Sequence, residues 1–358
     1  MKSTLLVSFS LALFSSSLAL GATITVPDDY ATIQAAIDAA AEGDTIQVRA
    51  GEYQEVIDFG VKNLTLESID GADSTFIGVQ SPPTSIVSIV GGQDSSTVFR
   101  GFTVRYGYKG TPAPQNPSIL LGGGLYTLSS SPTIENCLFT DNKTAFGSGA
   151  YVLYGSPSFS NCTFFDNYST SSGGGLQLFQ CSATINGCLF DDNFAIYDGG
   201  GTKIVEGNCV FSDCVFTNNT ADEGGGVFWF ASTNPTPHSL ALLGCSITLN
   251  ERSSSGFGAG LRTRYGYTLV DLAETTICDN TPDQIYGPFV ETGPNVLCVC
   301  PADLTGNGEI DGADLGILLA YWGPCAGEPC FPDLNDDGLV DGGDLGLLLA
   351  GWGACSFP

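Results

Sequence analysis

Short runs of alternating hydrophobic and polar residues recur along the middle of the chain with a fixed period. One unit reads GGGLYTLSSSPTIENCLFTDN, in which LYTL and TIENCLF have the length and alternation of strands. Glycine, serine, asparagine and aspartate separate these runs, as is typical of turns. Copies of the unit begin at Gly122, Gly147, Gly173, Gly199, Gly224 and Gly258. A period of about 25 residues indicates one structural unit that is stacked many times.

Each copy has room for three short strands and three turns, and it holds no stretch long enough for a helical repeat. Parallel strands stacked in this way predict a right-handed parallel β-helix, with successive coils about 4.8 Å apart. The expected fold class is therefore mainly β, and we place the β-helix at residues 23–297.

A column of cysteines holds the same place in successive copies, two residues before an apolar position and five before an asparagine. The side chains of one column point the same way, so we expect these cysteines to face inward as small core residues. A chain of disulfides is the alternative, but bridge geometry along a parallel stack is strained. The members are Cys137, Cys162, Cys188, Cys214 and Cys245.

A column of asparagines closes each copy. Asparagine tolerates left-handed turn conformations, and stacked amides can form hydrogen bonds from coil to coil. We therefore expect a structural role for this column. Its members are Asn142, Asn167, Asn193, Asn219, Asn250 and Asn280.

The segment PDDYATIQAAIDAAAEGDTIQVRAGEY, ahead of the repeats, predicts an amphipathic helix. Asp28 or Asp29 is expected as its N-cap and Gly43 as its C-terminal stop. Such a helix would cover the first hydrophobic layer of the coil stack and protect its open edge. Its apolar face comprises Ile33, Ala36, Ile37 and Ala40.

Composition adds a location and excludes some partners. The first residues, MKSTLLVSFSLALFSSSLALGA, have one lysine, a short apolar run interrupted by serines, and then small residues. They predict a secretory signal peptide over residues 1–22, and a membrane anchor, the alternative, would need a longer run. The 38 acidic and 11 basic residues give a formal charge of −27. This charge argues against nucleic acid and anionic membranes as partners, and we expect a secreted protein without membrane insertion.

Two stretches resemble known families. The segment TIQAAIDAAAEGDTIQVRAGEY resembles the N-terminal cap of pectin-lyase-like β-helix proteins. The pairs of GGGL or GGGV with FTDN, FFDN, FDDN or FTNN resemble the repeats of polymorphic outer-membrane proteins. The two resemblances together cover roughly residues 25–290 and imply the same β-helix. Those outer-membrane proteins continue into a translocating barrel, whereas here the repeats lead into a different C-terminal segment.

That segment holds two copies of one acidic loop followed by an apolar run, DLTGNGEIDGADLGILLAYWG and DLNDDGLVDGGDLGLLLAGWG. Oxygen-bearing residues at loop positions 1, 3, 5, 9 and 12, with glycine at 6 and a carbonyl at 7, form the pattern that wraps a calcium ion. Acidic turns without metal are the alternative. The first loop supplies Asp303, Thr305, Asn307, the Glu309 carbonyl, Asp311 and Asp314, with Gly308 at the bend. The second supplies Asp333, Asn335, Asp337, the Leu339 carbonyl, Asp341 and Asp344, with Gly338.

A duplicated loop and helix with aspartate at position 12 resembles the type I dockerin family over residues 302–354. The resemblance implies a small α-helical module at residues 298–358 that two Ca²⁺ ions fold and that docks on a cohesin-like protein or cell-surface scaffold. Residues 301–358 carry ten acidic and no basic side chains, so without calcium we expect this segment to be disordered.

The module departs from the family at loop positions 10 and 11, where hydroxyl residues often read the cohesin. Here these positions hold Gly312 with Ala313 and Gly342 with Gly343, so the partner stays open. Clasping disulfides are expected around the module, in a pattern the sequence leaves open. The cysteines concerned are Cys298, Cys300, Cys325, Cys330 and Cys355.

The catalytic candidates occupy the position just before each asparagine of the column. In successive copies this position holds Asp141, Asp166, Asp192 and then Asn218, and Asp191 lies beside them. Carboxylates stacked about 4.8 Å apart would raise at least one pKa or recruit calcium. Ordinary turn chemistry is the simpler interpretation, because aspartate suits a solvated turn before asparagine.

The basic residues do not complete a catalytic site with these aspartates. Lys203, Arg262 and Arg264 fall in another strand, and His238, the only histidine, lies in the insertion, where we expect a surface loop.

A second column follows the glycine clusters and is expected to face outward. If exposed, its aromatic and polar residues could stack on sugar rings or dock a protein; packing under a long loop is the equal alternative. The column comprises Tyr126, Tyr151, Gln177, Lys203, Phe228 and Arg262.

Two functions from different classes follow. The first is a non-catalytic protein that recognises a carbohydrate polymer or cell-surface material and is attached through its calcium module. The second is a polysaccharide lyase or glycoside hydrolase. The absence of a clear carboxylate-plus-base constellation favours the first. The acidic charge disfavours polyanionic substrates unless calcium bridges them.

Overall fold

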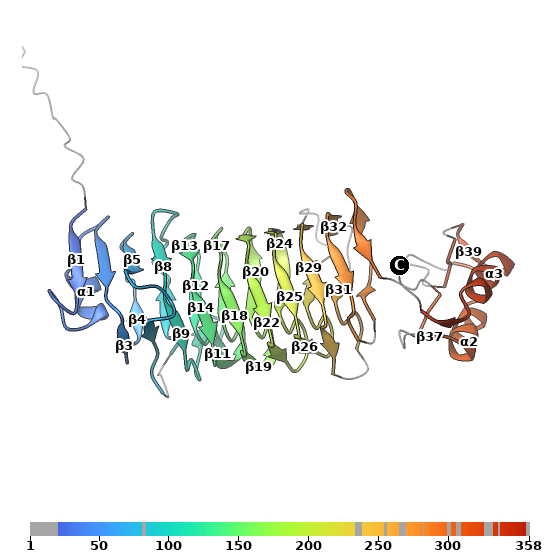
Figure 1. The fold of residues 1–358 in the computed structure, drawn as a ribbon, viewed down its shortest axis with the longest axis horizontal. Helices are drawn as coiled ribbons and strands as arrows, with labels where there is room; N and C mark the ends of the chain where they lie inside the picture. Colours follow the sequence, from blue (N-terminus) through green and yellow to red (C-terminus); the bar gives the residue numbers. More distant parts are fainter. Residues whose placement is uncertain are drawn as a thin grey trace, which may run out of the picture.

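The computed structural model describes residues 21–80, 84–232, 238–253, 256–264, 270–281, 283–298, 302–305, 309–325, 332–335 and 337–355. The signal peptide predicted for residues 1–22 lies almost wholly outside this part. The described coils form an elongated stack of parallel strands, and a small helical module follows its C-terminal end (Figure 1). In the described residues, no helix is long and apolar enough to cross a membrane.

The coil wall consists of four faces, each a row of parallel strands from successive coils. Face A contains β1 (Thr23–Val26), β2 (Thr45–Val48), β5 (Thr65–Ser68), β8 (Val98–Arg100), β13 (Thr133–Glu135), β17 (Ser158–Ser160), β21 (Thr184–Asn186), β28 (Ser239–Leu243), β32 (Val270–Ala273) and β35 (Val290–Glu291). Face B contains β3 (Gly51–Tyr53), β6 (Thr75–Ile77), β9 (Thr103–Arg105), β14 (Leu138–Thr140), β18 (Thr163–Phe165), β22 (Leu189–Asp191), β25 (Val215–Thr217), β29 (Ser246–Thr248), β33 (Thr276–Cys278) and β36 (Val296–Leu297).

Face C contains β4 (Ile57–Asp58), β7 (Val87–Ile89), β12 (Leu125–Leu128), β16 (Ala150–Leu153), β20 (Leu176–Cys181), β27 (Val227–Phe230), β31 (Leu261–Arg264) and β34 (Ile285–Tyr286). The long strand β24 (Thr202–Ser212) runs through faces C and A and joins them into one sheet. Face D contains β10 (Thr111–Ala113), β11 (Asn116–Leu121), β15 (Lys143–Phe146), β19 (Tyr168–Ser172), β23 (Phe194–Ala195), β26 (Thr220–Ala221) and β30 (Glu251–Arg252).

Face D corrects the sequence analysis, which expected three strands in each coil. The residues after each stacked asparagine form a fourth short strand, as in β15, because they pair in parallel with the next coil. Its first members, β10 and β11, are an antiparallel hairpin outside the repeat pattern, and β11 joins the row through Leu121 and Phe146.

The stacked asparagines form a continuous ladder of hydrogen bonds, as predicted. Each Asn Nδ2 donates to the Oδ1 of the next coil's asparagine at 2.8–3.0 Å, and the same oxygen accepts the preceding coil's backbone N–H. The ladder begins where Asn142 Oδ1 accepts from Gly107 N–H and ends where Asn280 Nδ2 donates to Gln284 Oε1.

The left-handed conformation was expected of these asparagines, but it falls on the residue before each of them. Those residues have φ between 50° and 58° and are Asp141, Asp166, Asp192, Asn218, Leu249 and Asp279. The asparagine is then free to turn its amide into the stack, where it satisfies buried backbone groups.

The cysteine column is buried and its thiols are free, as predicted. These side chains lie beside stacked rings on face B, where Phe164 and Phe190 have centroids 4.8 Å apart and Phe190 and Phe216 4.6 Å. Cys181 and Cys209 are two further buried thiols that the column did not include. Together these side chains fill the interior of the coil with small and aromatic groups.

The N-terminal helix α1 (Ile33–Ala39) buries the predicted apolar side chains against the first coils. Its caps differ from the prediction. Thr32 is the N-cap, because its Oγ1 accepts from Ala35 N–H, while Asp29 accepts instead from Thr25. The helix ends at Ala39, and the extended conformation of Ala40 stops it before Gly43 is reached.

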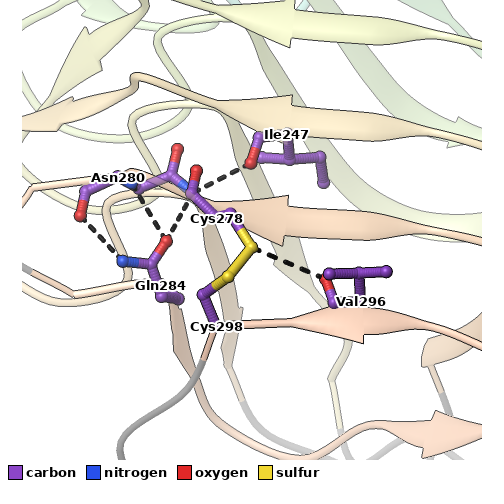
Figure 2. Close-up of a disulfide and its surroundings, with 6 residues drawn as sticks. All are labelled: Ile247, Cys278, Asn280, Gln284, Val296 and Cys298. Carbon is purple, nitrogen blue, oxygen red and sulfur yellow. Dashed lines mark hydrogen bonds between the residues drawn. A yellow bond between two sulfur atoms is a disulfide. The ribbon is translucent and has the colours of Figure 1, made fainter. Parts of the chain in front are cut away.

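The last coil is fixed by a disulfide between Cys278 of β33 and Cys298 (Figure 2). Gln284, which closes the asparagine ladder, lies beside it. Cys298 therefore belongs to the end of the β-helix and not to a clasp around the following module. Cys325 and Cys355 are disulfide-bonded, whereas Cys300 and Cys330 lie outside the described residues.

The C-terminal module is a duplication in structure as well as in sequence. The first repeat contains β37 (Glu309–Ile310), α2 (Gly312–Ala320) and β38 (Gly323–Pro324); the second contains β39 (Leu339–Val340), α3 (Gly342–Ala350) and β40 (Gly353–Ala354). Strand β37 pairs with β40 and β38 with β39, so the repeats interlock around a small core that includes Leu318 and Leu348.

Replacing Asn193 with alanine tests the ladder. Asn193→Ala should lower the free energy of unfolding by about 3 kcal/mol, because it removes the oxygen that accepts from the buried Nδ2 and backbone N–H of Asn167 and the amide that donates to Asn219 Oδ1. Urea unfolding followed by circular dichroism measures this loss. Asn186→Ala, on an exposed side chain of β21, is the matched control and should change stability by less than about 0.5 kcal/mol. Equal effects of the two substitutions would contradict the ladder's role.

Candidate functional site

The predicted outward column lies on face C, but most of it is not exposed. Tyr126, Tyr151 and Phe228 are at most 5% exposed, and Gln177 is 3% exposed. The alternative, packing under a covering segment, is correct for the first coils: the hairpin β10–β11 lies against Tyr126 and Tyr151 through Ala113 and Leu121. The repeat pattern could not indicate this cover, because the hairpin sequence does not repeat.

Next to the hairpin, whose Ala113, Ile119 and Leu121 line part of it, the same face is hollowed into a groove of ≈ 690 Å³. Its floor takes one residue from each of four successive strands, namely Tyr151, Gln177, Lys203 and Phe228. Four coils about 4.8 Å apart give the groove a length on the order of 14 Å along the stack axis. The groove therefore runs along the stack axis and crosses the strands.

A second row, two residues further along each strand, forms one wall of the groove. It runs Leu153, Phe179, Val205 and Phe230 in register. Phe179 and Phe230 are half-buried, so part of each ring is open to a ligand. The sequence analysis missed this row, although the fourth positions of LQLF and VFWF carry it.

The cations at the groove are held by carboxylates. Lys203 Nζ lies 2.5 Å from Asp198 Oδ2 and also donates to Ser172 Oγ at 3.2 Å. Arg264 Nη1 lies 3.8 Å from Glu223 Oε2, an oxygen that also pairs with Arg262 Nε at 3.0 Å. Burial raises the pKa of Tyr151 well above its ordinary value, so that phenol stays neutral.

The aspartates singled out as catalytic candidates lie at the corner between faces B and D, away from the groove. Asp141, Asp166 and Asp192 are exposed and lie in successive coils. Burial, followed by the charges of Asp141 and Asp192, raises the pKa of Asp166, as the spacing predicted. Asp191 accepts a hydrogen bond from Asn218 Nδ2 at 2.8 Å.

None of the basic residues considered in the sequence analysis lies beside this column of aspartates. Lys203, Arg262 and Arg264 are on face C, as the sequence analysis indicated. His238 follows the insertion and is half-buried; its Nδ1 accepts from Gly207 N–H at 2.9 Å. The left-handed φ shared by this turn column favours turn chemistry for the aspartates.

The acidic loops place their first and last residues toward the loop backbone. Asp333 accepts from Asp337 and Gly338 N–H, and Gly338 makes the predicted bend with φ 87°. Asp344 is fully buried and accepts from Leu334 and Asp341 N–H. Asp314 does the same for Thr305 and Asp311 in the first loop. Asn307 and Gly308 lie outside the described residues.

The donor chemistry of these loops fits a hard cation such as Ca²⁺. Carboxylate, amide and carbonyl oxygens are its preferred ligands, and the module contains no basic side chain to balance its ten acidic ones. In the present arrangement, no three histidine, cysteine or acidic side chains among the described residues are grouped so that they could hold a metal ion. Calcium at these loops therefore stays a prediction.

Comparison with known proteins covers the β-helix. Residues 89–250 match the family model described as the right-handed beta helix region, and this part of the chain is a right-handed parallel β-helix. No curated protein matches the sequence.

Solved structures similar to the chain include two pectin methylesterases and a pectate lyase. The enzyme from carrot is 16% identical, with 78% of this chain and 84% of that chain covered and a TM-score of 0.42. PemA from Erwinia chrysanthemi is 14% identical (78% and 90% covered, TM-score 0.41). Pectate lyase Pel9A is 13% identical (77% and 67% covered, TM-score 0.45). No conclusion about function rests on these likenesses.

The pKa of Asp166 gives a prediction for stability against pH. A carboxyl whose pKa is raised by folding stabilises the protein below its unfolded pKa, and that contribution is lost as pH rises through the folded pKa. Asp166→Asn should therefore raise the melting temperature at neutral pH and lose this advantage in acid, with an effect well under about 1 kcal/mol for so exposed a group.

Asp213→Asn is the matched control for thermal melts between acid and neutral pH. Asp213 has the same left-handed conformation, but its column holds Gly187 and Gly244 in the neighbouring coils. Repulsion within the column would be contradicted if Asp166→Asn raised the melting temperature as much in acid as at neutral pH. It would also be contradicted if Asp213→Asn raised the melting temperature by the same amount.

Proposed function

We propose that the mature chain is a secreted polysaccharide-binding protein that is attached through a calcium-loaded C-terminal module. The groove on face C would hold a sugar polymer, and the module would dock on a cohesin-like protein or cell-surface scaffold. The observation that carries the first half is the groove, in which four successive coils each contribute one residue to the floor.

The lining of the groove suits sugars. Sugar rings present C–H groups on their faces and hydroxyls at their edges, so they bind where aromatic rings and amides alternate. Here Phe179 and Phe230 supply partly exposed aromatic rings, and Gln177 and Gln180 supply amides. Because the floor repeats coil by coil, the groove favours a ligand that also repeats along its length.

The module supports attachment through its exposed apolar side chains. Leu319 and Trp322 at the end of α2 are matched by Leu349 and Trp352 at the end of α3, and all four are about half exposed. Exposed tryptophans of this kind are typical anchors of protein interfaces. Glycine and alanine at loop positions 10 and 11 leave the helix starts without hydroxyls, so we expect apolar contacts to dominate the docking.

Catalysis is the second candidate, as a polysaccharide lyase or glycoside hydrolase. The raised pKa of Asp166 favours it, because a carboxyl that holds its proton can act as a general acid. The arrangement argues against it, since Lys203, Arg262 and Arg264 lie on face C, and Lys143, two residues after Asp141, has its Nζ over the ring of Tyr168 at 4.4 Å from the centroid. Binding is therefore the function that the geometry supports better.

Retention on insoluble polysaccharides tests the binding function. We expect the mature protein to be retained on at least one polymer, and Phe179→Ala combined with Phe230→Ala to weaken retention by at least about tenfold, because both aromatic rings of the wall row are lost. Phe165→Ala, on an exposed ring of face B, is the control and should change retention less than about twofold. Retention that survives loss of both groove rings would place binding elsewhere.

The same incubations test catalysis. New reducing ends or unsaturated products that disappear in Asp166→Ala, but persist in Asp213→Ala, would make the protein an enzyme with the aspartate column as its site. We expect no product from any of these proteins.

Calcium dependence is measured by hydrogen exchange on the mature chain. Calcium should slow exchange across α2 and α3 by at least about tenfold while the β-helix is unchanged, because the ion would bind only the folded loops. Asp344→Asn should reduce this protection, and Asp279→Asn, a matched charge removal on the β-helix, should not. Equal protection of the module with a calcium chelator would contradict the calcium assignment.

A further inference from the structure

Two of the half-buried aromatic rings that line the groove have a fixed spacing. Phe179 on β20 and Phe230 on β27 stand in one column, with Val205 of β24 between them. They are thus two coils apart, or about 9.6 Å. Both rings line the groove and both are half-buried, so each is fixed by its strand and still presents a face. Extended β-linked sugar chains repeat at nearly the coil spacing, so such rings would meet every second sugar.

The charges of the groove select against an anionic polymer. Lys203 is enclosed by Asp198, by Ser172 and by the ring of Phe228, whose centroid lies 5.3 Å from Nζ. Arg264 shares Glu223 with Arg262. Each cation near the groove therefore already has a carboxylate partner, while the chain as a whole carries a charge of −27. A polyuronate would have to displace these carboxylates against that overall charge.

Gln177 gives the floor a hydrogen-bonding group that the described residues do not use. Its side chain is 3% exposed, and its Oε1 accepts no hydrogen bond from the described part of the chain. A buried amide oxygen without a partner is unfavourable, so it favours a ligand that brings hydroxyl groups. Rotation about its last torsion presents either the carbonyl or the NH₂ to a sugar hydroxyl, which can donate and accept.

We propose that the groove selects an uncharged, extended polysaccharide, with Phe179 and Phe230 as stacking rings two coils apart and Gln177, on the same strand as Phe179, as a hydrogen-bonding group. This inference rests on the proposed function and narrows it to neutral polymers. The partner chemistry is a chain of unsubstituted or neutrally substituted sugars. Pectic and other acidic chains are excluded.

Titration calorimetry on the mature, calcium-loaded protein tests the proposal with defined probes. These are cellohexaose, xylohexaose and mannohexaose as neutral chains and hexagalacturonate as the acidic one. We expect at least one neutral chain to bind, with an affinity that changes less than about twofold across salt concentrations that screen surface charge. Hexagalacturonate should not bind.

Variants then locate the site. Phe179→Leu and Phe230→Leu keep an apolar side chain and remove the ring, and each should weaken neutral binding about tenfold. Gln177→Leu should weaken it at least as much, whereas Phe165→Leu, outside the groove, should stay within about twofold of the parent. Melting curves of the variants confirm that each one is folded.

Asp198→Asn tests the charge argument directly, because it leaves Lys203 without its carboxylate. This variant should gain measurable affinity for hexagalacturonate, and that affinity should fall with salt. Failure to gain it in a folded variant would overturn the argument that the paired lysine excludes acidic chains.

The outcomes separate this inference from the proposed function. Preference of the parent protein for hexagalacturonate, lost in the Phe179 and Phe230 variants, would overturn the neutral class and leave polysaccharide binding in place. If the affinity for neutral chains is unchanged in all three groove variants, the assigned site is wrong. No binding of any probe, with no retention on any insoluble polymer, would overturn both.

Discussion

The coil-to-coil hydrogen bonds of the asparagine ladder are the interaction on which the rest of the structure depends. Each buried amide joins one coil to the next through two donors, its own Nδ2 and the backbone N–H, that share a single acceptor oxygen. The ladder thereby fixes the register of successive coils. Because the coils are in register, side chains at equivalent positions form straight columns, and the groove on face C is built from two such columns. The disulfide and Gln284 close this system at its last coil (Figure 2).

Repeating features could be predicted from the sequence because residues one repeat apart occupy equivalent places in neighbouring coils. The asparagine ladder and the buried cysteines follow from columns about 4.8 Å apart. Burial is the main cause of the raised pKa of Asp166, and only the further contribution of Asp141 and Asp192 follows from the column. What the period does not contain could not be predicted. The hairpin β10–β11 occurs once, yet it decides that Tyr126 and Tyr151 are covered. The fourth strand was hidden because segments such as KTAF and YSTSS lack a regular apolar alternation.

The site shows the same division. The sequence correctly placed one column on this face, namely Tyr151, Gln177, Lys203 and Phe228. It could not show that these residues are buried or that Phe179 and Phe230 form a wall beside them, because both depend on how the hairpin β10–β11 packs on the face. The pairing of the charged residues in the structure also differs from what their spacing in the sequence suggested. Lys203 has no aspartate of the predicted column near it and pairs instead with Asp198, five residues away in the turn before its own strand. Lys203 and Arg264 therefore line the groove and are not part of a site with the aspartates. The aspartate column remains a set of turn residues that share a left-handed conformation.

A crystal structure of the mature protein with a bound neutral hexasaccharide is the most direct test of this account. The account predicts an extended sugar chain lying along the coil axis in the face C groove, with sugars stacked on Phe179 and Phe230 and a hydroxyl bonded to Gln177. A chain bound across the aspartate column, or one that leaves this groove empty while it occupies another face, would contradict it.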